Sequence, residues 1–233
     1  MNTPTSVFDR LLAIVLTIAA FAMAVTLVQR ERRASLNTRS AEARIAYVPE
    51  WKEALSLSIP RDTRAAPVTI VEVIDLECRA CARFSSIARD LERRFVDSLA
   101  VVLLHYPLSQ HQFAREAAHA AECSDQAGVA AAFVETVLAK QDSLGKLEWG
   151  GLASRAGIKD LSAFRDCMND PLTTMRIDSA IVLAKRLRAV GTPTIIVNGW
   201  RIRGPLTTEL IGTVVGELLA GRDPRKAVRE LSD

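Results

Sequence analysis

The feature that most constrains this chain is a close pair of cysteines at the junction between a buried strand and a helix. Residues 67–76 (PVTIVEVIDL) form a β-branched apolar run of strand length, which is typical of a strand covered on both faces. Cys78 and Cys81 come next in the chain. Beyond them, apolar side chains recur at the spacing of an amphipathic helix, at positions Phe84, Ile87, Ala88, Leu91 and Phe95. We therefore expect the pair in the first turn of a helix that follows a central strand.

This position gives the two thiols different chemistry. The start of a helix presents backbone N–H groups without intrahelical partners and the positive end of the helix dipole, and both stabilise a thiolate. Cys78, beside the cation of Arg79, is the expected nucleophile in thiol–disulfide exchange, and Cys81 is the expected resolving thiol. The alternatives are half of a zinc site and two inert thiols. A zinc ribbon needs a second close pair, whereas Cys123 and Cys167 are far apart in the sequence. We therefore favour redox chemistry with no metal.

A carboxylate interrupts the buried strand. Glu72 stands between Val71 and Val73, six residues before Cys78, and a buried carboxyl group is costly unless it is paired, hydrated or used. Burial raises the pKa of such a group, so Glu72 could move protons during exchange. The alternative is a residue near the strand end that pairs with an arginine.

The rest of the domain alternates strands and helices. Residues 100–105 form a second strand, residues 111–190 are largely helical and rich in alanine, and residues 194–197 and 200–203 form a hairpin around Asn198-Gly199. A final helix follows. The order is β-α-β, a helical insert, then β-β-α, which predicts an α/β domain over residues 63–233 with the insert at about 110–190.

The dipeptide Thr192-Pro193 stands directly before the hairpin. Proline is tolerated at the first residue of a strand, and a cis bond there would turn the chain sharply, but from the dipeptide alone we expect an ordinary trans bond.

Several motifs in order resemble one family. The strand–CxxC–helix unit, the acid six residues upstream and the late Thr-Pro resemble the thioredoxin fold. The stretches "VEVIDLECRACARF", "HYPLSQHQFAREAAHAAEC" and "GTPTIIVNG" resemble its DsbA-like branch of thiol:disulfide oxidoreductases. The likeness covers roughly residues 55–222. The dipeptide Arg-Ala between the cysteines differs from that of the best-known members, so their redox potential does not transfer.

The resemblance implies roles for further residues. It implies a cis Pro193 facing the cysteines, with the backbone of Thr192 aligning a substrate strand, and it matches Glu72 to the buried acid of the fold. It also implies a second, structural disulfide, Cys123–Cys167, whose loop of about 45 residues would contribute up to roughly 4 kcal/mol. Two buried free thiols are the alternative.

An uncharged apolar segment lies near the N-terminus. As a helix, residues 11–28 would span about 27 Å at about 1.5 Å per residue, close to the roughly 30 Å of a hydrocarbon core. We expect residues 1–29 to form a single membrane anchor, with a cleaved signal peptide as the alternative. Residues 30–62, polar and rich in arginine, are the expected juxtamembrane connector.

The sequence gives conflicting signals about the side of the membrane on which the domain lies. Arg30, Arg32 and Arg33 follow the apolar segment, which by the positive-inside rule alone predicts a cytoplasmic domain. Large domains, however, cross largely regardless of flanking charge, and a structural disulfide suits an oxidising compartment. We therefore expect a single-pass membrane protein whose catalytic domain is extracytoplasmic, on the periplasmic side.

Together these features predict a membrane-tethered thiol:disulfide oxidoreductase that needs no cofactor. Its expected partners are cysteine-containing protein substrates and a membrane redox protein that recycles the pair. With 30 basic against 27 acidic residues, the net charge of +3 gives little support to nucleic-acid binding. The alternatives are a reductase or isomerase kept reduced by a membrane partner, and a non-catalytic thioredoxin-fold binding module.

Overall fold

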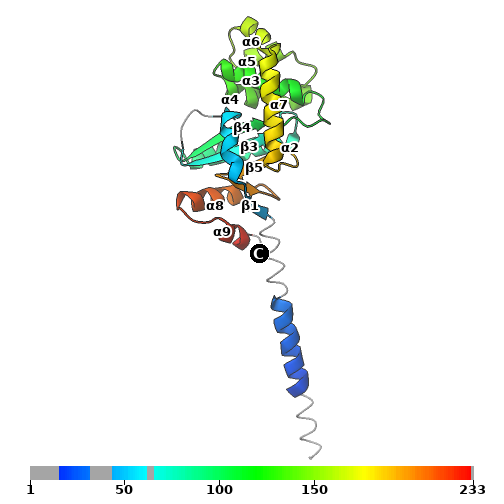
Figure 1. The fold of residues 1–233 in the computed structure, drawn as a ribbon, viewed down its shortest axis with the longest axis vertical. Coiled ribbons are helices and arrows are strands. Elements are labelled where there is room, and N and C mark those ends of the chain that lie inside the picture. Colours follow the sequence, from blue (N-terminus) through cyan, green and yellow to red (C-terminus); the bar gives the residue numbers. More distant parts are fainter. Residues whose placement is uncertain (1–15, 32–43, 62–65, 232–233) are drawn as a thin grey trace, which may run out of the picture.

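The domain is built around one mixed sheet of six strands. The computed structural model describes residues 16–31, 44–61 and 66–231. In the described part, the strand order across the sheet is β1-β6-β5-β3-β4-β2, with helices on both faces (Figure 1). The predicted thioredoxin-like α/β order with a helical insert is confirmed, with two additional strands at the edges.

The central unit is the predicted strand–helix–strand. β3 (Val68–Ile74) and β4 (Leu99–His105) are parallel neighbours, joined by α2 (Arg79–Arg94). The helix buries one stripe at helical spacing, which consists of Cys81, Phe84, Ser85, Ala88 and Leu91. Burial of this stripe against the sheet holds the start of α2 at the end of β3.

The hairpin follows the Asn-Gly signal. β5 (Thr194–Val197) and β6 (Trp200–Ile202) are antiparallel, and β5 also pairs antiparallel with β3. Gly199 has a φ of 90°, which glycine adopts without strain. A Cβ at this position would lie 2.7 Å from Cδ1 of Trp51, so the turn also needs glycine for close packing.

Part of the predicted connector belongs to the sheet. Within residues 30–62, β1 (Ile45–Tyr47) pairs with β6, and β2 (Ile59–Pro60) pairs with β4. Between them lies η1 (Pro49–Ser56), a 3-10 helix that buries Trp51. These strands have only three and two residues, too few for the alternation that marks a strand in a sequence. Residues 32–43 and 62–65 lie outside the described part.

The helical insert separates β4 from β5. Its helices are α3 (Ala114–Gln126), α4 (Ala130–Ala139), η2 (Gln141–Ser143), α5 (Trp149–Arg155), α6 (Leu161–Met168) and α7 (Pro171–Arg186). Asp160 accepts hydrogen bonds from the backbone N–H groups of Ser162 and Ala163, as expected for the residue that caps α6. Cys123 on α3 and Cys167 on α6 are joined in a disulfide bond.

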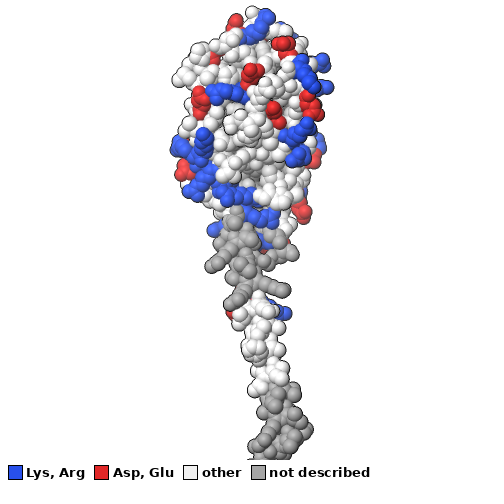
Figure 2. Space-filling model, turned by 90° about the vertical axis from the view of Figure 1, so that its right-hand side faces the viewer, with Lys and Arg blue, Asp and Glu red and all other residues white. Residues whose placement is uncertain are grey.

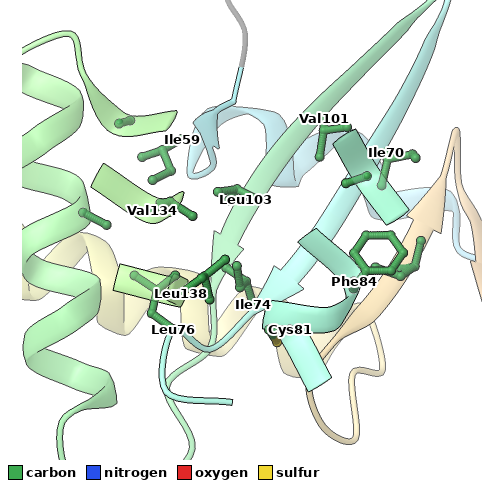
Figure 3. Close-up of a cluster of buried hydrophobic side chains, with 14 of the residues drawn as sticks. Ile59, Ile70, Ile74, Leu76, Cys81, Phe84, Val101, Leu103, Val134 and Leu138 are labelled. Atoms are coloured by element: carbon green, nitrogen blue, oxygen red, sulfur yellow. The ribbon is translucent and has the colours of Figure 1, made fainter. Parts of the chain in front are cut away.

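Two apolar clusters cover the sheet. On one face, α2, α8 (Thr208–Leu219) and the insert pack against β3 and β4; Figure 3 shows ten labelled members of this cluster, among them Cys81, Phe84 and Ile74. On the other face, α7 and η1 pack on the alternate side chains of the same strands, such as Val71 and Val73. Each central strand is thus buried on both sides, which explains its near-continuous apolar sequence. The chain ends with α9 (Arg225–Glu230).

The predicted anchor is described only in part. Residues 16–31 are helical and exposed, whereas residues 1–15 lie outside the described range (Figure 1). Among the helices that the structure describes, none combines the length and the apolar character needed to cross a membrane.

The surface charge is unevenly distributed. Figure 2 shows acidic and basic side chains intermixed over the upper half of the visible face. Lys and Arg gather in a band across its lower part.

Candidate active site

The cysteine pair lies at the start of α2, as the sequence predicts. Cys78 is the N-cap residue, and its carbonyl accepts hydrogen bonds from the backbone N–H groups of Cys81, at 3.0 Å, and Ala82, at 3.2 Å. Both cysteines are free thiols; Cys78 is half-buried and Cys81 is fully buried. Only Cys78 can therefore meet a protein substrate directly.

A second segment completes the site from the far end of the insert. The Thr192–Pro193 peptide bond is cis, and the Cys78 thiol donates a hydrogen bond to the Thr192 carbonyl at 3.4 Å. The two segments, far apart in sequence, thus form one surface around the Cys78 sulfur.

The environment lowers the pKa of Cys78 to about 5. The main cause is a hydrogen bond from the Cys81 thiol, with further bonds from the Thr192 hydroxyl and from the backbone N–H groups of Cys81 and Ala80. Burial opposes the shift. The pKa of Cys81 is raised instead, first by burial and then by its bond to Cys78 and the nearby carboxyl group of Glu72. The nucleophile and the resolving thiol are thereby distinguished before any substrate arrives.

Glu72 lies below the pair in the centre of the sheet. It stands between Leu103 of β4 and Ile195 of β5 and has no exposed surface. Neither carboxyl oxygen has a hydrogen-bond partner among the described residues. Burial raises the pKa of Glu72 to about 8, against the lowering effect of the Arg61 guanidinium. At neutral pH the Glu72 carboxyl group therefore holds a proton. The alternative from the sequence, an ion pair between Glu72 and an arginine, is not found among the described contacts.

The loop between β3 and α2 is held by side chains that sequence reasoning missed. The buried carboxylate of Asp75 accepts hydrogen bonds from the backbone N–H groups of Glu77 and Leu108, both at 2.8 Å, and its Oδ2 lies 2.8 Å from Nδ1 of His111. Burial, the largest single effect, lowers the pKa of His111, but the bond to Asp75 together with the nearby negative charges, first that of Asp75, raises it overall. Asp75 thus ties the cysteine loop to the segment after β4.

The helical insert also holds the cysteine loop through hydrogen bonds. Gln141 in η2 donates hydrogen bonds from Nε2 to the carbonyls of Leu76, at 2.9 Å, and Cys78, at 3.0 Å. Asp142 beside it forms an ion pair with Arg79. Asp75 had a signal in the sequence, as a polar residue at the end of an apolar strand. No sequence pattern indicated a role for Gln141, because its contacts with the cysteine loop arise only when the chain is folded.

The other two cysteines are placed elsewhere. Cys123 and Cys167 are bonded to each other within the insert, so they are not free to complete a zinc site with Cys78 and Cys81. In the part of the chain that the structure describes, no three His, Cys, Asp or Glu side chains form a cluster able to hold a metal ion.

Cys78 should react as a thiolate well below neutral pH. We expect the rate of its alkylation by iodoacetamide to rise with a midpoint near pH 5. In Cys81→Ala the midpoint should move upward, because the strongest donor is lost, and in Thr192→Val it should move upward by less. Mass spectrometry of the alkylated peptide measures the rate. Identical profiles for Cys81→Ala and the wild type would contradict this account.

The raised pKa of Glu72 should make stability depend on pH. Its proton is retained in the folded state up to about pH 8 but lost in the unfolded chain near the ordinary value of 4.5, so the stability contributed by this group is complete below about pH 4.5 and lost as the pH rises through 8. Relative to the wild type, Glu72→Gln should gain about 3 kcal/mol of unfolding free energy between pH 4 and pH 7. Urea unfolding measures this. The exposed control Glu209→Gln should show no such gain, and parallel profiles for Glu72→Gln and the wild type would refute it.

The sequence comparisons agree with this architecture. Residues 63–217 match the family model described as Thioredoxin. Among curated relatives, Na(+)/H(+) antiporter NhaA 3 of Salinispora tropica is 34% identical over 173 residues, which cover 70% of this chain and 26% of that protein. NhaA of Herminiimonas arsenicoxydans is 29% identical over 155 residues, covering 66% and 24%. The chain thus spans about a quarter of the length of these relatives.

Solved structures share the fold at low sequence identity. Oxidised BdbD from Bacillus subtilis has a TM-score of 0.64 at 20% identity, with 72% of this chain and 95% of that chain covered. DsbA from Xylella fastidiosa has a TM-score of 0.56 at 21% identity, covering 76% and 94%. The catalytic domain of Proteus mirabilis ScsC has a TM-score of 0.61 at 17% identity, covering 78% and 98%. The solved structures, which include a DsbA, show the same overall fold, and the match over residues 63–217 shows that the chain belongs to the thioredoxin family.

Proposed function

We propose that this protein is a thiol:disulfide oxidoreductase that donates disulfides to cysteine-containing protein substrates. One observation carries the proposal. A half-buried thiol of lowered pKa, Cys78, lies against the carbonyl that precedes a cis proline and beside a fully buried second thiol, Cys81. In this arrangement the Cys78 sulfur is accessible to a substrate, and the buried Cys81 sulfur is accessible only to Cys78.

The reaction would proceed through a mixed disulfide. A substrate thiolate attacks the Cys78 sulfur of the oxidised protein, the Cys78–Cys81 bond breaks, and its electron pair goes to the Cys81 sulfur. A second substrate thiolate then attacks the substrate sulfur of the mixed disulfide and releases Cys78 as a thiolate. The substrate leaves with a disulfide, and the protein has gained two electrons.

Glu72 is suited to the proton step. The pKa of Cys81 is raised, so its leaving sulfur needs a proton, and Glu72 holds one at neutral pH because burial raises its own pKa to about 8. The Thr192 carbonyl contacts the Cys78 sulfur, and the Thr192 backbone with Pro193 after it would hold the substrate backbone beside that sulfur.

The lowered pKa of Cys78 favours the oxidising direction. A stabilised thiolate makes the reduced protein more stable and is the better leaving group, so the disulfide form gives up its bond readily. This favours the oxidase over a reductase or isomerase kept reduced by a membrane partner. In a purely binding module, replacing Cys78 would leave function intact.

A trapping experiment tests the catalytic roles. Cys81→Ala should accumulate a mixed disulfide with a disulfide-bonded peptide, because Cys78 attacks and no second protein thiol resolves the intermediate. Cys78→Ser should form none. In the complementary reaction, the oxidised wild type should convert a reduced two-cysteine peptide to its disulfide. Non-reducing electrophoresis and mass spectrometry detect both products, and absence of the adduct in Cys81→Ala would reject the mechanism.

We further propose that the N-terminal helix tethers the domain to a membrane, with the domain on the extracytoplasmic side. Most apolar side chains of residues 16–28 are exposed, with Phe21 at 73% and Met23 at 67%. Exposed apolar side chains along one helix indicate contact with lipid or another apolar partner. A membrane redox protein would then reoxidise the pair.

Membrane extraction tests the tether. The wild type should stay with the membrane fraction after an alkaline carbonate wash, whereas a double variant, Ile18→Lys and Phe21→Lys, should be released. Each lysine near the centre of a span costs about 3 kcal/mol on insertion scales. Val96→Lys, which replaces an apolar side chain of the domain that is 56% exposed, is the control and should stay bound. Release of the wild type by the wash would contradict the tether.

A further inference from the structure

Two cavities flank the segment that carries the cis proline. The first, of about 650 Å³, lies between the loop after β4, the start of α3 and the end of α7. The second, of about 460 Å³, lies between the same segment and the residues after β6, and Thr192 and Pro193 form part of its wall. Val190 and Gly191 line both cavities. We call the two together the flanking cleft.

Cys78 lines neither cavity, but the flanking cleft includes residues that contact Cys78 or hold its loop. Thr192, in the wall of the second cavity, accepts the hydrogen bond of the Cys78 thiol. His111, in the wall of the first cavity, is bonded to Asp75, which holds the cysteine loop. A substrate cysteine joined to Cys78 would therefore lie beside this cleft. Residues of an extended substrate advance by about 3.3 Å each, so a few residues next to that cysteine are enough to extend along the cleft.

All charged side chains that line the flanking cleft are basic. They are His111, Arg115 and Lys185 in the first cavity and Arg203 in the second, and no carboxylate of the described chain lines either.

Two of these basic groups already have partners. His111 contacts the buried Asp75, and Arg115 pairs with Asp178 at 2.6 Å. Lys185 and Arg203 form no ion pair with any residue that the structure describes, so they contribute the uncompensated positive charge.

Cations are concentrated behind the second cavity as well. The pKa of Arg201 is lowered first by burial and then by the charges of Arg203 and Arg188. Between the two cavities, the side chain of Val190 is 89% exposed and offers an apolar contact. The cleft thus combines an apolar ridge with positive charge on both sides.

We propose that the flanking cleft selects protein substrates with acidic side chains next to the reactive cysteine. Carboxylates on either side of that cysteine would meet Lys185 and Arg203, which steers the substrate and holds it in register for attack on Cys78. This selectivity rests on the proposed oxidase function and adds its substrate class.

The experiment compares three two-cysteine peptides that differ only in the residues flanking the cysteines, which are Glu, Gln or Lys. Oxidation of each by the oxidised full chain is followed by mass spectrometry after acid quenching. The ratio of the Glu-peptide rate to the Lys-peptide rate is the readout. The flanking residues also change the intrinsic reactivity of the peptide thiols, but this effect is the same for every protein variant. A difference in the ratio between two variants therefore reports on the protein alone.

We expect the ratio to fall by about tenfold in the double variant Lys185→Glu and Arg203→Glu at low ionic strength, and the difference between proteins to shrink at high salt. Lys185→Arg, which keeps the charge, should retain the wild-type ratio. The single variant Lys185→Glu should also lower the ratio, and Lys159→Glu is its matched control, because it makes the same lysine-to-glutamate change near the Cys123–Cys167 disulfide instead of the cleft. Circular dichroism and thermal unfolding establish that each variant is folded.

The outcomes separate this proposal from the proposed function. Oxidation of all three peptides with the same ratio in every protein variant would overturn the acidic selectivity and leave the oxidase intact. An equal fall in Lys159→Glu would also overturn it, since net charge rather than the cleft would then be responsible. Failure to oxidise any of the peptides would overturn the proposed function and the selectivity with it.

Discussion

The antiparallel pairing of β5 with β3 is the constraint on which the active site depends. In this register Val73, near the end of β3, lies opposite Thr194, at the start of β5. The residues after one strand and before the other must therefore meet at the same edge of the sheet. Cys78 follows β3 by four residues, and Thr192 precedes β5 by two, so the pairing brings together two segments that the whole helical insert separates, and a hydrogen bond joins them.

Exposure and hydrogen bonding divide the chemistry among three neighbouring groups. Cys78 has donors and partial access to solvent, so its pKa is lowered. Cys81 and Glu72 are enclosed by α2 and the sheet, so burial raises the pKa of each. The charged form is thereby favoured at the outer sulfur and disfavoured at the inner two groups. This gradient matches a reaction in which a thiolate leaves from the outside and a proton is supplied from within.

The helical insert contributes contacts to the active site although it is distant from the cysteine pair in the sequence. Gln141 in η2 holds two carbonyls of the cysteine loop, and α3 and α7 contribute the basic wall of the flanking cleft. The Cys123–Cys167 disulfide links α3 to α6 within the same insert. The insert therefore positions the catalytic loop and shapes the surface beside it, while the sheet supplies the catalytic residues.

The sequence by itself determined the elements and the chemistry that depend on local pattern. The apolar run of β3, the helical spacing of α2, the Asn-Gly turn and the cysteine pair are all encoded by neighbouring residues, and the thioredoxin-like order follows from them. Only the tertiary structure decided which distant groups meet: β1 and β2 at the sheet edges, the Asp75–His111 contact, the clamp of Gln141 and the basic flanking cleft. The reason is physical. A strand of two or three residues leaves no periodicity to detect, and a contact across the fold depends on packing that no single segment specifies.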